Sequence, residues 1–185
     1  MVRNGETLTL ESCIFSGNQC AYGGAAVHTA ADNTTILGCT FFNNNSTTSQ
    51  YPDRAIFVRR GTATLAGNLF YGNRASNGNV VYGGRAVSLG YNVSDYASGT
   101  TTTTSGFTFV TGDVQVTTAT VNATTFKPVD SAALATLRII PVPITPAGFP
   151  TTDFYGNDRS TNSGGGYTAA GAVAVENCPF AVVGL

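Results

Sequence analysis

The chain has 185 residues with a formal net charge of −1 at pH 7, and only 10% of its residues are charged. This length suits one domain with its own core. Its nine lysine and arginine residues are too few for the basic surface that nucleic-acid binding needs, so we expect no nucleic-acid partner.

The uncharged polar residues are mainly Thr, Asn, Ser and Gly, which favour strands and turns over helices. The composition therefore predicts an all-β fold, and it is common among extracellular β-proteins. No stretch approaches the roughly 18 apolar residues of a membrane helix, so we expect no transmembrane segment. Residues 1–6 contain no apolar run, so we expect any export signal to lie upstream.

A repeat runs through the first half of the chain. Three six-residue blocks begin at residues 13, 39 and 68, each with an aliphatic residue three positions upstream. Their alignment gives three columns: Leu10, Ile36 and Leu65; Phe15, Phe41 and Phe70; Asn18, Asn44 and Asn73. A second set follows the blocks: Ala26-Val27, Ala55-Ile56 and Ala86-Val87, with Gly-Gly pairs at residues 23 and 83.

These columns predict short strands that pair in parallel, one repeat beside the next, about 4.8 Å apart. One aliphatic or aromatic side chain per strand would point inward and stack on its counterpart. The Asn column would lie at a bend, where Asn can adopt a left-handed backbone and its amide can bond to the Asn above and below. The preceding glycines would allow a sharp corner.

From Thr7 to Leu89 this pattern resembles the right-handed parallel β-helix repeat proteins of bacterial surfaces, including polymorphic outer-membrane proteins and exported proteins of the Bacteroidetes. Their coils read like C-x-F-x-G-N followed by G-G-A-[IV]. The resemblance implies a right-handed parallel β-helix of about three coils.

The second half carries four further motifs, at Gly90–Asp95, Thr111–Asp113, Asp153–Arg159 and Ala169–Val173. In this order they resemble the C-terminal region of the choice-of-anchor Q family, which is defined by organisation rather than by activity. Unlike in some relatives, the residues after Val173 do not read as a sorting tail, so we expect none in this segment. The resemblance implies an irregular C-terminal cap, fixed by an ion pair or turn bonds of Asp153 and Arg159.

We therefore expect β-helix coils over residues 1–90, then last coils, a loop and the cap over residues 91–185, in one structural domain. Because the chain begins almost inside a coil, we expect further coils upstream, or a partner, to cover its N-terminal edge.

No catalytic or metal-binding constellation stands out. The acids of the repeat region, Glu11, Asp32 and Asp53, fall in different columns. His28 follows the inward Val27, so its side chain should point outward or lie at a corner. We expect the four cysteines to be small buried hydrophobes, with a Cys20–Cys178 disulfide as an alternative. We predict no metal and no cofactor.

A charged rim is the best candidate for ligand binding. Its residues are Tyr51, Asp53, Arg54, Arg59, Arg60 and Arg85, although a solvated loop rim is the alternative interpretation. Exposed tyrosines suit sugar rings, so glycans are a candidate ligand.

The sequence predicts a non-catalytic protein of the extracellular or outer cell surface. Its expected role is adhesion or glycan binding, with glycans or host and cell-surface proteins as partners. The first alternative is a polysaccharide lyase or glycoside hydrolase with its site on missing upstream coils. The second is a structural element of a surface assembly.

Overall fold

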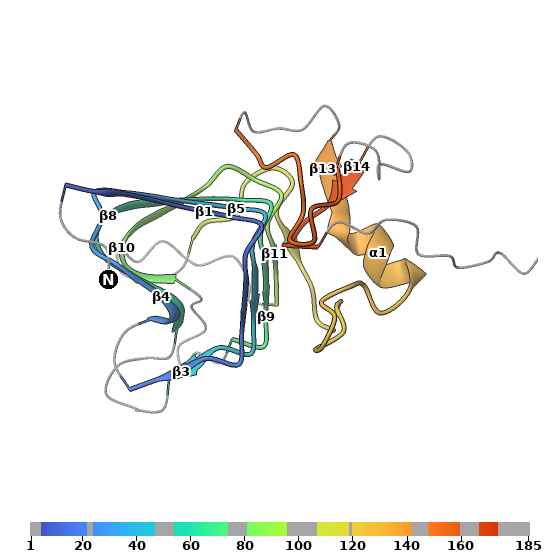
Figure 1. The fold of residues 1–185 in the computed structure, drawn as a ribbon, viewed down its shortest axis with the longest axis horizontal. Coiled ribbons are helices and arrows are strands. Elements are labelled where there is room, and N and C mark those ends of the chain that lie inside the picture. Colours follow the sequence, from blue (N-terminus) through green and yellow to red (C-terminus); the bar gives the residue numbers. More distant parts are fainter. Residues whose placement is uncertain are drawn as a thin grey trace, which may run out of the picture.

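The chain forms parallel sheets whose strands stack level upon level (Figure 1). In this computed structural model the described residues are 5–21, 24–46, 54–73, 81–95, 107–118, 120–141, 148–159 and 167–173. None of the helices in these ranges is long and apolar enough to span a membrane. Strands predominate over the short helix, so the predicted all-β class is confirmed.

Three parallel sheets build the stack. The first contains β1 (Thr7–Glu11), β5 (Asn33–Leu37), β8 (Arg54–Ala66) and β10 (Val81–Ser88), with β4 (Gly24–Thr29) also paired to β8. The second runs in the order β2 (Ile14–Ser16), β6 (Thr40–Phe42), β9 (Leu69–Tyr71), β11 (Val93–Ser94) and β12 (Val114–Gln115). The third pairs β3 (Gln19–Cys20) with β7 (Asn45–Ser46).

We call each layer of the stack a level, and the first level contains β1 to β4. The register confirms the predicted aliphatic column, because Leu10 pairs with Ile36 and Ile36 with Leu65. Two bent strands join levels: the first part of β8 belongs to the second level and its second part to the third, and β10 bends likewise from the third level to the fourth.

The predicted aromatic column is also confirmed. The rings of Phe15 and Phe41 stack with centroids 5.0 Å apart, and those of Phe41 and Phe70 are again 5.0 Å apart. Each such pair adds about 0.5–1.5 kcal/mol beyond its area burial. At the fourth level Ser94 pairs with Phe70, and the ring of Phe107 lies 5.8 Å from that of Phe70. Phe107 therefore covers the core where the column has only a small residue.

The predicted asparagine ladder is present. The Asn18 amide donates to Oδ1 of Asn44 (2.8 Å), and the Asn44 amide donates to Oδ1 of Asn73 (2.9 Å). The second amide hydrogen of Asn44 goes back to the carbonyl oxygen of Phe15, at 2.9 Å. The left-handed backbone lies one residue earlier than expected, at Gly17, Asn43 and Gly72. The corner is thus made by the residue before each ladder Asn.

A second ladder lines the corner before the second sheet. The repeat columns did not predict it. The Asn68 amide donates to Oδ1 of Asn92 (2.9 Å), and the Asn92 amide donates to Oδ1 of Asp113 (3.0 Å). At the level before Asn68, Oδ1 of Asn68 accepts from the backbone N–H of Cys39. The residue before each position of this column has a positive φ: Ser12, Gly38, Gly67, Tyr91 and Gly112.

The stack therefore continues beyond the predicted end of the repeat near residue 89. Val93 pairs with Leu69, and Val114 pairs with Val93, which gives the second sheet five strands rather than the expected three. The second column set also differs from its predicted alignment. Val81 pairs with Ile56, and Val87 pairs with Thr64. In β10 the Gly-Gly bend follows the residue that pairs with Ile56, whereas in β4 the bend precedes it.

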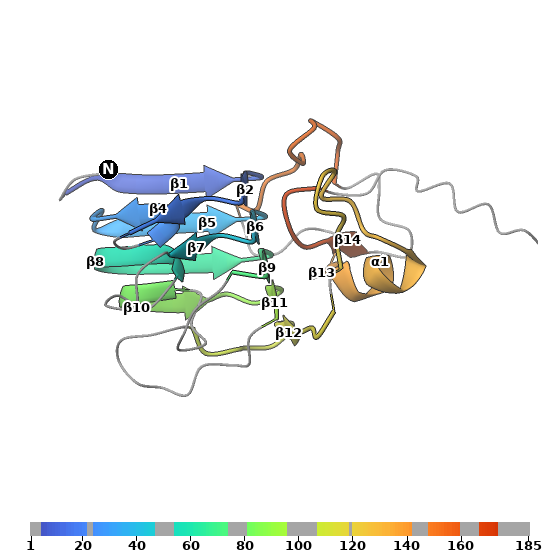
Figure 2. The same cartoon turned by 90° about the horizontal axis from the view of Figure 1, so that it is seen from below.

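The C-terminal segment lies beside the stack and not over its last level (Figure 2). It contains α1 (Ser131–Leu137), β13 (Arg138–Pro141) and β14 (Tyr167–Ala169), with β13 and β14 antiparallel. Its apolar side chains pack on the outer face of the second sheet, where Phe42, Leu69 and Val93 join the same cluster as Leu137 and Ile140. The expected cap is thus a flank that holds several levels together.

Arg159 anchors this flank. Its side chain is fully buried and donates to the carbonyl oxygens of Gly171 (2.7 Å), Ala169 (3.0 Å) and Thr152 (3.3 Å). The guanidinium also lies over the ring of Phe149, 5.4 Å from its centroid. Burial lowers the pKa of Arg159 to about 10, so the side chain stays charged at neutral pH.

Asp153 holds the turn that precedes Arg159. Its Oδ1 accepts from the backbone N–H groups of Tyr155 (2.8 Å) and Asn157 (2.9 Å). The expectation that this motif fixes the C-terminal region through turn bonds is therefore confirmed. The charge of Arg159 is balanced mainly by carbonyl oxygens.

We expect Asn44→Ala to lower the free energy of unfolding by about 2–4 kcal/mol, because it leaves several buried ladder partners unsatisfied. Asn18→Ala is the matched control: Asn18 is exposed at the open end of the same column, and its loss should cost less than about 1 kcal/mol. Urea denaturation measures both. Equal losses for the two variants would contradict the role of the ladder.

We expect Arg159→Met to cost about 3 kcal/mol or more, since it keeps the apolar volume but removes the donors of three carbonyl oxygens. Arg159→Lys should fall between this variant and the parent chain, because Lys has fewer donors. The exposed Arg59→Met should change stability by less than about 0.5 kcal/mol. Limited proteolysis of residues 148–173 would report loosening of the flank, and an unchanged cleavage rate in Arg159→Met would count against the anchor.

Candidate functional site

The predicted rim residues lie mainly on β8 and β10. Tyr51 and Asp53 are outside the described residues, as is the side chain of Arg54, so their part in a site stays a prediction. Arg59, Arg60 and Arg85 are exposed.

The register changes which rim residues are neighbours. Arg85 was expected in the column of Arg54, but it pairs with Thr62, eight positions further along β8, whereas Arg54 pairs with Gly24. The difference arises because the register of β10 shifts at its Gly-Gly bend, between Gly83 and Arg85. Among the rim residues that the structure describes, Arg85 thus lies nearer in register to Arg60 than to Arg54.

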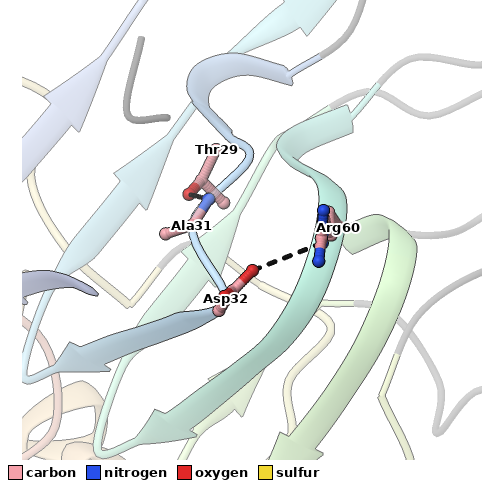
Figure 3. A network of polar contacts seen from close by, with 4 residues as sticks. All are labelled: Thr29, Ala31, Asp32 and Arg60. Atoms are coloured by element: carbon pink, nitrogen blue, oxygen red, sulfur yellow. Dashed lines mark hydrogen bonds and ion pairs between the residues drawn. The ribbon is translucent and has the colours of Figure 1, made fainter. Parts of the chain in front are cut away.

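One of these cations has an acidic partner, as Figure 3 shows. Nε of Arg60 lies 3.3 Å from Oδ1 of Asp32, and 59% and 45% of the two side chains are exposed. An exposed pair of this kind contributes about 0–1 kcal/mol. The two residues lie at neighbouring bends, since the backbone N–H of Thr62 donates to the carbonyl of Asp32 at 3.1 Å.

The bend around Asp32 is closely packed. The backbone N–H of Ala31 donates to Oγ1 of Thr29 at 3.1 Å (Figure 3). Gly61 has a φ of 75°, and a Cβ at this position would lie 2.2 Å from the carbonyl oxygen of Asp32. Arg60 and Asp32 thus join two tight bends of adjacent levels, which is a structural task.

His28 is exposed, as predicted. Its ring meets the Phe57 ring edge-on, with centroids 4.8 Å apart. Desolvation and the nearby charge of Arg59 lower its pKa. Within the described ranges, no group of three His, Cys, Asp or Glu side chains could hold a metal ion.

Two cysteines lie in one column at the N-terminal end of the stack. Cys13 and Cys39 precede the paired residues Ile14 and Thr40, which brings their side chains together on adjacent levels. Cys39 is fully buried, as expected for a small core residue, and Cys13 is half-buried. A hydrogen bond from the Cys39 thiol lowers the pKa of Cys13 to about 6 and raises that of Cys39. Cys178 is outside the described residues, so its pairing with Cys20 stays a prediction.

An apolar opening lies at the same end. A cavity of about 380 Å³ is lined by Leu8, Leu10, Phe15, Gly24, Ala26, Val27 and His28. The sequence predicts an open edge here, but the cavity depends on side-chain packing that the repeat pattern does not contain.

No family model matches the chain, and neither a curated protein nor a solved structure matches it.

We expect the rate at which iodoacetamide alkylates Cys13 to be half-maximal near pH 6. Peptide mass spectrometry measures the extent of alkylation at each pH. Cys39→Ala removes the thiol that donates to Cys13, so the midpoint should rise towards the ordinary thiol range of about 8.5. Cys39→Ser keeps a donor and should shift it less. A pH profile unchanged by Cys39→Ala would contradict the contact.

Proposed function

We propose that this chain is the non-catalytic closing end of a right-handed parallel β-helix in an exported surface protein. The carrying observation is that the asparagine column of the second sheet ends on a carboxylate, Asp113. A carboxylate accepts hydrogen bonds but has no N–H to donate to a further level. Parallel strands joined by crossovers are right-handed in about 98% of cases, which supports the proposed handedness.

Asp95 has a related position at the other corner. Its Oδ2 accepts from the backbone N–H of Gly72 at 2.6 Å, and burial raises its pKa. Gly72 immediately precedes Asn73, the last described Asn of the first ladder. An acid therefore ends the second ladder, and another accepts from the residue beside the first.

The motifs that resemble the choice-of-anchor Q family have connected structural roles, which supports the family proposal. Asn92 and Asp113 complete a ladder, and Arg159 binds the carbonyls of Ala169 and Gly171. The backbone N–H of Ala172 donates to Oγ1 of Thr40 at 2.9 Å, which connects the last motif to the stack. Such roles suit a family defined by organisation.

The proposed lack of catalysis is supported by the hydrogen bonds of two acidic side chains. Asp113 and Asp153 accept hydrogen bonds from backbone N–H groups of their own turns, at 2.8 Å each from Val110 and Tyr155. Carboxylates held in this way stabilise turns and are poorly placed to move a proton to a substrate.

Binding of acidic glycans is the second candidate function, since Arg59 and Arg85 are exposed. In the part of the chain that the structure describes, no ion pair is found for either residue. A glycan array with the parent chain and with the Arg59→Ala, Arg85→Ala double variant tests it. Binding that is equal for both, or absent for both, would remove this candidate.

The proposed closing role is tested with Asp113→Asn. Oδ2 of Asp113 accepts from Oγ of Ser88 (2.7 Å) and from the Val110 N–H, and an amide nitrogen there would face two donors. We expect a loss of about 1–3 kcal/mol in urea denaturation.

Asp130→Asn is the matched control for this change. Asp130 accepts from the Ala133 N–H at the start of α1, and Asn caps a helix as well as Asp does, so stability should stay nearly unchanged. Parent-like stability of Asp113→Asn would contradict the closing role. Release of unsaturated or reducing sugars from polysaccharides by the purified chain would contradict the non-catalytic role.

A further inference from the structure

The N-terminal face of the stack presents four strand edges. Among the described residues, β1, β2, β3 and β4 each pair with a strand on one side only: β5, β6, β7 and β8. In parallel pairing the other edge of each strand offers a row of N–H and C=O groups to a further strand.

The interior is open at the same face. Leu10 and Phe15 are half-exposed, whereas their neighbours in the next level, Ile36 and Phe41, are fully buried. These side chains line the cavity of about 380 Å³. The face therefore offers to a further level the same kinds of groups that the second level offers to the first: strand edges and apolar side chains.

The hydrogen bonds between the Asn side chains of the first ladder all run in one direction along the stack. Oδ1 of Asn44 accepts from the backbone N–H (3.2 Å) and the amide (2.8 Å) of Asn18. Within the described part of the chain, Oδ1 of Asn18 has no donor. An incoming level with Asn in this column would supply both donors, and a level without one would leave this acceptor to water.

The flank extends beyond the first level. The carbonyl of Thr152 accepts from Oγ of Ser12, at the first corner of level one. From there the orange segment 148–159 extends past β1 in Figure 2. It carries two exposed aromatic side chains, Phe154 (51%) and Tyr155 (53%), whose rings meet edge-on at 5.2 Å. A coil added to the stack would lie beside this overhang.

We propose that the N-terminal face binds one further parallel β-coil of the same repeat, with an aliphatic residue above Leu10, an aromatic residue above Phe15 and Asn above Asn18. This inference rests on the proposed β-helix. A second copy of this chain stacked head to tail does not fit the polarity of the face. Its last level would place Asp113 in the column of Cys13, and Thr118, four residues after Val114, in the column of Asn18, so neither position carries an amide that could donate.

The test adds such a coil to the full chain. A copy of residues 33–61 is fused directly before Thr7, because Thr7 pairs with Asn33 just as Asn33 pairs with Thr62. The copy then places Ile36, Phe41 and Asn44 above Leu10, Phe15 and Asn18. In the matched control fusion, Ile36 and Phe41 of the copy are changed to Asp.

We expect the fused coil to slow hydrogen exchange of the β1 and β2 amides at least about tenfold and to abolish binding of an apolar dye. The control fusion should behave like the parent chain. A third fusion, with Asn44→Ala in the copy alone, should give weaker protection if the ladder continues across the face.

A second measurement does not depend on folding of the fusion. The 33–61 segment is titrated as a free peptide against the parent chain, and it should protect the same amides, whereas its Asp-substituted form should not. Protection in neither experiment overturns the proposal. A parent chain that forms a dimer with protected β1 amides also overturns it, in favour of a second copy. The Asp113→Asn result is independent of these outcomes.

Discussion

The structure depends on one constraint: each buried asparagine side chain of the second to fourth levels must satisfy two donors and two acceptor positions. Asn44 does so by accepting from Asn18 and by donating to Asn73 and to the carbonyl of Phe15. Because the partners are one level above and below, the requirement fixes the spacing of levels more strictly than apolar packing can. The stacked Phe rings then fill an interior whose register is already set.

The flank responds to a different problem. Apolar side chains on the outer face of the second sheet, such as Phe42 and Leu69, need cover, and the C-terminal segment supplies it from the side. Glycine at the corner column permits this close approach, since a Cβ at Gly67 would lie 2.4 Å from the ring of Phe149. Arg159 then ties the segment together through carbonyl oxygens. Cover from the side stabilises several levels at once, whereas a cover over the end would stabilise one.

Sequence columns predicted the inward Phe and Leu stacks and the first Asn ladder, because each repeat places one residue type at one structural position. They failed where residue types change within a column. The second ladder passes from Cys39 to Asn68, Asn92 and Asp113, so no single letter marks it. The Ala-Val match at Val87 was wrong, because a similar short motif recurs on the other side of a bend. The expected alignment of Arg85 with Arg54 was wrong for the same reason. The position of the flank depends on long-range contacts that no local pattern contains.

The difference between an amide and a carboxylate at Asp113 has a broader meaning for the height of the stack. Along this column, an amide transmits the hydrogen-bond pattern from one level to the next, and a carboxylate receives it without passing it on. The number of levels is therefore not fixed by the number of residues in each level. The levels of the second sheet are 26, 29, 24 and 21 residues apart, yet the column ends at a single side chain. If Asp113 ends the stack as proposed, one side chain sets the number of levels, whatever the length of the chain between them.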